Sequence, residues 1–87
     1  MPQKKSGSPK KLGSAGRTYK IIELVGTSPE SYEAAIRRAV QDASRTLRGL
    51  AWFEVGELRG VIQEGDVFEF QAKVKVGFRV LGERDDR

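Results

Sequence analysis

Residues 68–80, FEFQAKVKVGFRV, alternate between apolar side chains and residues that are polar or glycine. The apolar members of this stretch are Phe68, Phe70, Ala72, Val74, Val76, Phe78 and Val80. Because side chains point alternately to the two faces of a strand, the pattern predicts a long strand with one buried face and one wet or polar face. Glu64, Gly65 and Asp66 precede it and predict a tight turn.

The segment before this turn, LAWFEVGELRGVI (residues 50–62), is predicted to form another long strand. Gly56 and Gly60 interrupt it and mark positions for a β-bulge or a close backbone approach. Residues 19–25, YKIIELV, are apolar and rich in β-branched side chains. They predict a first strand, which Gly26 is expected to end.

A helix is predicted between the first two strands. Ser28 is expected to be its N-cap and Pro29 its first residue, with Thr27 and Glu30 as an alternative capping pair. Gly49 is expected to end the helix. The apolar stripe, at steps of three and four residues, comprises Tyr32, Ala35, Ile36, Ala39, Val40, Ala43 and Leu47.

The order strand, helix, strand, strand predicts an α+β fold in which one helix packs on a three-stranded antiparallel sheet. Since the chain reverses at each connection, the third strand must lie in the middle if all neighbours are antiparallel. A strand of about fourteen residues is roughly 45 Å long, which is more than one helix can cover. Both outer strands are also open edges. A further partner is therefore expected, and assembly into an oligomer would supply it.

Charge is unevenly distributed along the chain. Residues 1–17 hold five of the sixteen Lys and Arg and none of the twelve Asp and Glu, so the remainder is nearly neutral. We expect residues 1–17 to be a flexible basic arm, residues 18–82 to be the folded domain and residues 83–87 to be a C-terminal tail. A solvated arm is favoured over one that binds phosphates, and nucleic acid is not an expected partner.

Several classes of function are excluded by composition. The chain has no Cys and no His, which rules out disulfides, thiolate metal sites and a Cys nucleophile and removes the commonest general base. No stretch approaches the roughly 18–20 apolar residues of a membrane helix, and the N-terminus lacks the apolar run of a secretory signal. We expect a cytoplasmic protein without membrane contact, without a metal and without a catalytic constellation.

Trp52 is the only tryptophan in the sequence. If Phe53 and Val55 face the core, alternation places Trp52 on the opposite face, together with Gln71. Two interpretations of this side chain carry equal weight. It is buried in a subunit interface, or it serves as an aromatic platform for a planar ligand. The two interpretations are compatible if the ligand lies within the interface.

Gln71 is too far from Trp52 for one chain to place both on a small ligand. A hairpin that turns at Gly65 and Asp66 pairs Gln71 with about Gly60 or Val61, which leaves roughly 26 Å along the strand to Trp52. A site that uses both residues would therefore need two subunits.

Arg59 joins the face of Gln71 only if Gly56 forms a bulge, in which case Leu58 and Ile62 turn to the core. A guanidinium stacks on planar rings and binds phosphate, which suits a nucleotide-like ligand. A solvated or interface arginine is nevertheless the commoner outcome.

Four runs of the sequence closely resemble the dodecin family: YKIIELVGTSPESYEAAIRRAV, TLRGLAWFEV, ELRGVI and FQAKVKVGFRV. The resemblance spans residues 18–81 and rests on ordered motifs, namely GTS before the helix, WFEV, and Q-x-x-V-x-V-x-F in the last strand. It implies a hollow, roughly spherical homo-dodecamer that stores flavin and protects it from light without turnover.

The resemblance also implies roles for the candidate residues. Symmetry-related copies of Trp52 would enclose a pair of stacked flavins, and Gln71 would hydrogen-bond the pyrimidine edge. Arg59 matches the arginine that bacterial members carry near the flavin, which favours FMN over riboflavin. Some bacterial members also hold coenzyme A, and the sequence does not decide that. The alternatives are a structural oligomer, a nucleic-acid-associated protein that uses the basic arm, and a flavin enzyme.

Overall fold

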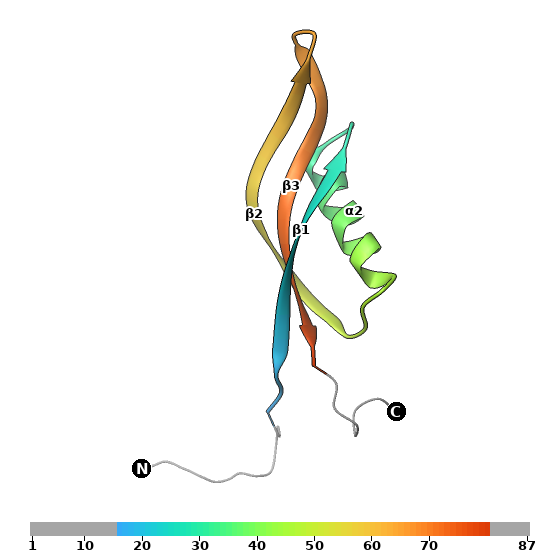
Figure 1. Ribbon diagram of the computed structural model, residues 1–87, viewed down its shortest axis with the longest axis vertical. Helices are drawn as coiled ribbons and strands as arrows, with labels where there is room; N and C mark the ends of the chain where they lie inside the picture. The colour runs from blue at the N-terminus through green and yellow to red at the C-terminus, as the bar shows by residue number, and fades with distance from the viewer. Residues whose placement is uncertain (1–15, 81–87) are drawn as a thin grey trace, which may run out of the picture.

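The computed structural model describes residues 16–80, which form three strands and one helix. The elements are β1 (Tyr19–Ser28), α2 (Tyr32–Ser44), β2 (Leu50–Gln63) and β3 (Asp66–Arg79). The strands form one antiparallel sheet in the order β1-β3-β2, and α2 lies against one face of it (Figure 1). The predicted fold and its central third strand are therefore confirmed. Most of the predicted arm, residues 1–15, and the predicted tail, residues 83–87, lie outside the described residues.

Small side chains form the core between α2 and the sheet. The buried cluster consists of Ala35, Ala39, Ala72, Val74 and Val76. Because alanine projects little from a helix, α2 can approach the sheet closely, and it lies over β1 and β3 rather than β2. The partly buried residues around this cluster are Ile22, Leu24, Ile36 and Leu50. The alternation predicted for the last strand is thus confirmed at its centre.

Gly26 does not end the first strand, as the sequence predicted. It lies inside β1, opposite Ala72 on β3. A Cβ atom at this position would clash with the carbonyl oxygen of Ala35 and would lie 2.9 Å from the Cβ atom of Ala39. Gly26 is therefore the point at which the helix backbone meets the sheet, and the glycine serves this close approach rather than a break.

The helix begins later than predicted. Its N-cap is Ser31, with extended backbone angles (φ −168°, ψ 165°), and the Ser31 hydroxyl accepts the N–H of Ala34 at 3.0 Å. Ser28 still belongs to β1 and is buried, and its hydroxyl accepts the N–H of Glu30 at 2.9 Å. The predicted Ser28 cap and the alternative pair are therefore wrong, because sheet pairing continues through Ser28.

The helix also ends before the predicted stop. Its C-cap is Arg45, whereas Gly49 adopts a positive φ of 72° just before β2 starts. At thirteen residues, α2 is short, and no helix within residues 16–80 is long and apolar enough to cross a membrane.

The β2–β3 hairpin contains the predicted bulge. Val55 pairs with Val74 and Leu58 pairs with Ala72, so that Gly56 and Glu57 together oppose one residue of β3. The turn between the strands is two residues long and uses Glu64 and Gly65, which both have positive φ angles of 54° and 79°. These angles match the right-handed twist of a tight hairpin, and the predicted turn is confirmed at these two residues.

Much of the hairpin extends past the end of the helix (Figure 1). Its exposed large apolar residues are Trp52, Phe53, Val55, Leu58, Ile62, Val67 and Phe68. Leu58 shares the face of buried Ala72, as predicted, but half of its surface remains exposed. Ile62 is 72% exposed, so the expectation that it turns into the core is wrong for the single chain. The expectation that one helix leaves part of the sheet uncovered is confirmed.

Gly26→Ala should destabilise the fold because the new methyl group must push α2 away from β1. We expect the free energy of unfolding to fall by about 2–3 kcal/mol in urea titrations at fixed protein concentration. Gly56→Ala is the matched control, since a Cβ atom there would lie 3.4 Å from the Lys73 carbonyl oxygen, an ordinary contact. Equal stability of the two variants would contradict the close approach at Gly26.

Candidate ligand-binding site

The sheet face turned away from α2, here called the open face, carries the three candidate residues. On β3 this face comprises the residues that alternate with the buried Ala72, Val74 and Val76. Directly paired residues of neighbouring strands share a face. Trp52 lies beside Gly77 and Arg59 lies opposite Gln71, so both side chains belong to the open face. The predicted side of Trp52 is confirmed, as is the effect of the bulge on Arg59.

Gly77 provides the surface on which the Trp52 ring rests. A Cβ atom at residue 77 would lie 2.5 Å from Cε2 and 2.6 Å from Cη2 of Trp52, distances that no real side chain tolerates. The indole ring is therefore in direct contact with the β3 backbone. Tyr19 on β1 flanks it, with ring centroids 5.0 Å apart and planes tilted by 58°. Trp52 nevertheless remains 41% exposed, which leaves ring surface for a further partner.

A polar network surrounds Gln71 at the other end of the open face. The Nε atom of Arg59 donates to Oε1 of Gln71 at 2.8 Å, and Nε2 of Gln71 donates to Oε2 of Glu69 at 2.8 Å. Glu57, within the bulge, places a carboxylate oxygen 3.9 Å from Nη1 of Arg59. Two acids thus flank the guanidinium and the amide, and the Arg59 side chain keeps about half of its surface exposed.

These two parts of the open face are well separated within one chain. Gln71 pairs with Arg59, not with Gly60 or Val61 as predicted, because the hairpin turns at Glu64 and Gly65 rather than at Gly65 and Asp66. The register shift between Val61 and Ile62 then makes Arg59, not Leu58, the partner of Gln71. Trp52 lies beside Gly77, six residues further along β3 than Gln71, so Trp52 and Gln71 are roughly 20 Å apart. The structure therefore brings Arg59 and Gln71 together but leaves Trp52 apart from them.

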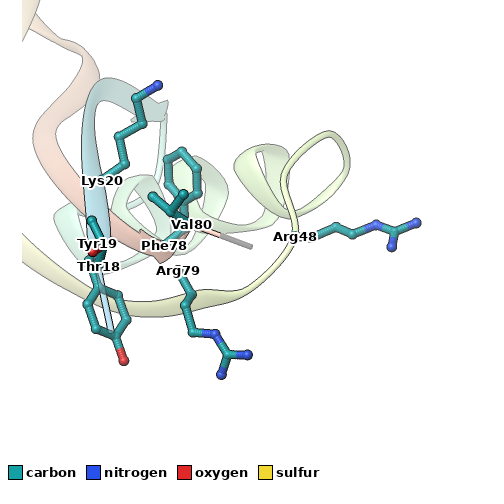
Figure 2. Close-up of a pocket in the computed structure, with 7 residues that line it drawn as sticks. All are labelled: Thr18, Tyr19, Lys20, Arg48, Phe78, Arg79 and Val80. Atoms are coloured by element: carbon teal, nitrogen blue, oxygen red, sulfur yellow. The ribbon is translucent and has the colours of Figure 1, made fainter. Parts of the chain in front are cut away.

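A pocket of about 500 Å³ opens at the end of the sheet next to Tyr19. Its lining residues are Thr18, Tyr19, Lys20, Arg48, Phe78, Arg79 and Val80. The charged ends of Lys20, Arg48 and Arg79 point in different directions (Figure 2). The pocket is therefore an open hollow beside the aromatic pair, and its cations do not converge on one point.

A protein-family model described as Dodecin matches residues 18–81, which include nearly all of the described chain. The chain belongs to the dodecin family. A dodecin from Thermus thermophilus is 55% identical over 65 residues, covering 75% of this chain and 94% of that protein. The solved structure of dodecin from Streptomyces coelicolor superimposes with a TM-score of 0.77 at 46% identity, covering 80% of this chain and all of that one.

The family also includes a relative named for a metal. A protein of Mycobacterium tuberculosis named calcium dodecin is 31% identical over 62 residues, covering 71% of this chain and 87% of that protein. Its crystal structure, described as having a novel calcium-binding site, superimposes with a TM-score of 0.67 at 30% identity, covering 76% and 94% of the two chains. Among residues 16–80 of the present dodecin, no group of three or more His, Cys, Asp or Glu is arranged to hold a metal ion.

Three residues of the open face were missed by sequence reasoning: Tyr19, Glu69 and Gly77. The alternation of β3 already places Glu69 and Gly77 on the same face as Gln71, so this signal was available. The contact of Tyr19 with Trp52 depends on the register of β1 against β3, which sequence alternation alone does not specify.

Gly77→Ala should displace the Trp52 ring, because the added methyl group occupies the space of the indole. Trp52 is the only tryptophan, so its emission spectrum and near-UV circular dichroism report this ring alone. We expect a red-shifted emission and a loss of near-UV signal with little change in the far-UV spectrum. Gly56→Ala is again the control. An unchanged Trp52 spectrum in Gly77→Ala would contradict the contact between the indole ring and the backbone at Gly77.

Proposed function

We propose that this dodecin binds flavin, with FMN as its preferred form, and holds it without turnover. The observation that carries the proposal is the partly exposed Trp52 ring, seated on Gly77 and flanked by Tyr19. A ring held in place on a strand is a preorganised surface for a planar heterocycle, because little conformational freedom is lost on stacking. Family membership supports the same conclusion.

The polar end of the open face suits the remaining parts of such a ligand. A glutamine amide offers one donor and one acceptor to a ring edge, and the flavin pyrimidine ring presents both. Gln71 would supply this contact. The guanidinium of Arg59 lies beside it and would favour a ligand that carries a phosphate. We therefore assign Trp52, Gln71 and Arg59 to the flavin site.

The distance between these residues makes the site an intersubunit site. One small ring system cannot reach both Trp52 and Gln71 of a single chain across roughly 20 Å. We propose a homo-dodecamer in which flavins lie in pairs between copies of Trp52, with Gln71 and Arg59 supplied across a subunit contact. Close contact with indole would quench the excited flavin, so the assembly would act as a store that limits photochemistry.

Trp52→Ala should weaken FMN binding about tenfold or more, because each flavin loses one indole contact, worth roughly 0.5–1.5 kcal/mol beyond burial, together with the apolar area that the ring covers. Titration of FMN fluorescence with purified protein measures both affinity and quenching. The natural chain should quench to saturation near one flavin per subunit, and Trp52→Phe should be intermediate. Equal affinity in Trp52→Ala would remove this residue from the site, and no quenching by the natural chain would refute flavin binding.

Leu58→Asp should disrupt the assembly, because a charge would enter an apolar surface that α2 does not cover. The natural chain is expected to elute as about twelve subunits and to carry the bound flavin. The variant is expected to elute as smaller species that do not quench FMN. Glu64→Gln, at the exposed hairpin turn, is the control. A Leu58→Asp protein that assembles and quenches normally would show that assembly does not bury Leu58, which would contradict this prediction.

A further inference from the structure

The amide of Gln71 lies between two charged side chains that permit it only one orientation. Arg59 donates to its oxygen and Glu69 accepts from its nitrogen, both at 2.8 Å. A guanidinium can only donate a hydrogen bond and a carboxylate can only accept one. Turning the amide by 180° would set the NH₂ group against the guanidinium and the oxygen against the carboxylate, and both contacts would be lost.

The two contacts still leave Gln71 able to bind a ligand. A primary amide has two N–H donors and an oxygen with two lone pairs, and the network uses one of each. One donor and one acceptor remain. Because the orientation is set from both sides, their order along the open face is set as well, with the oxygen toward β2 and the nitrogen toward Glu69.

We propose that Glu69 is a positioning residue of the binding site, acting through the Gln71 amide rather than on the ligand. With Arg59, it selects a ligand whose ring edge presents an N–H next to a carbonyl oxygen. This inference rests on the proposed flavin function and adds the rule by which the edge of the ring is chosen. An amide held in this way cannot turn to suit an edge that has only acceptors.

Riboflavin and 3-methylriboflavin form the matched ligand pair for the test. Both ligands lack a phosphate, so the change in protein charge on substituting Glu69 cannot alter affinity through attraction to a phosphate group. They differ in the N3–H donor that the Gln71 oxygen would accept. The natural protein should bind riboflavin at least about tenfold more tightly than its 3-methyl form, because the fixed oxygen loses its partner.

Glu69→Ala should reduce this preference by about threefold or more, because the freed amide can turn its NH₂ group to the carbonyl oxygens of the methylated ring. Glu69→Gln retains a neutral acceptor and should keep most of the preference. Glu54→Ala is the control, because it removes an acid from the same face, opposite Lys75, without touching Gln71. Titration of ligand fluorescence, with elution volume recorded on each sample, gives both affinities.

The outcomes separate this inference from the function on which it rests. Failure of the natural protein to bind riboflavin and FMN alike would overturn both, whereas binding of FMN without any binding of riboflavin would overturn only the ring-edge rule. Tight binding by the natural protein with the same preference in Glu69→Ala would overturn only the role of Glu69. If Glu69 had a purely structural role, Glu69→Ala would lower the affinity for both ligands equally and leave the ratio of the two affinities unchanged. That result would also count against a positioning role. If Glu69→Ala does not assemble, a full loss of preference in assembled Glu69→Gln would overturn the inference, since that variant keeps the acceptor.

Discussion

The length of the helix limits what the single chain can bury. At thirteen residues and about 1.5 Å per residue, α2 is roughly 20 Å long, whereas the fourteen-residue strands β2 and β3 extend roughly 46 Å at about 3.3 Å per residue. Less than half of the hairpin can lie under the helix. The uncovered apolar side chains follow from this mismatch, and they support the proposed assembly.

Strand β3 serves stability and binding through alternate residues. Its buried positions, represented by Ala72 and Val74, face the small side chains of α2 and form the core. The residues between them, represented by Gln71 and Gly77, form the polar network and the seat of the tryptophan ring. One continuous strand thus fixes the relation between core and site, because the position of each side chain on one face determines that of its neighbours on the other.

Local patterns predicted the features that depend on alternation, and missed those that depend on close approach. The strands, the central position of β3 and the bulge that turns Arg59 toward the open face follow from periodicity and glycine spacing. The sequence predicts that Gly26 ends a strand, but in the structure Gly26 lies within β1, where its lack of a side chain allows the helix backbone to approach closely. The sequence predicts that Ser28 is the N-cap of the helix, but in the structure Ser28 is still paired with β3 in the sheet. The contact of Tyr19 with Trp52 joins two strands that are not neighbours in the sheet, and no local pattern encodes it.

The bulge at Gly56 and Glu57 also governs how this chain tolerates changes in length. Trp52 and Arg59 are seven positions apart, an odd interval that would put them on opposite sides of a regular strand. The extra residue restores the phase, so that both belong to one side. Loss of a single codon here would remove the bulge and leave a regular strand whose later residues keep their sides, whereas loss of two would exchange inside and outside for every later position of β2. Whether the number of residues deleted in this stretch is odd or even should therefore matter more for the fold than how many are deleted.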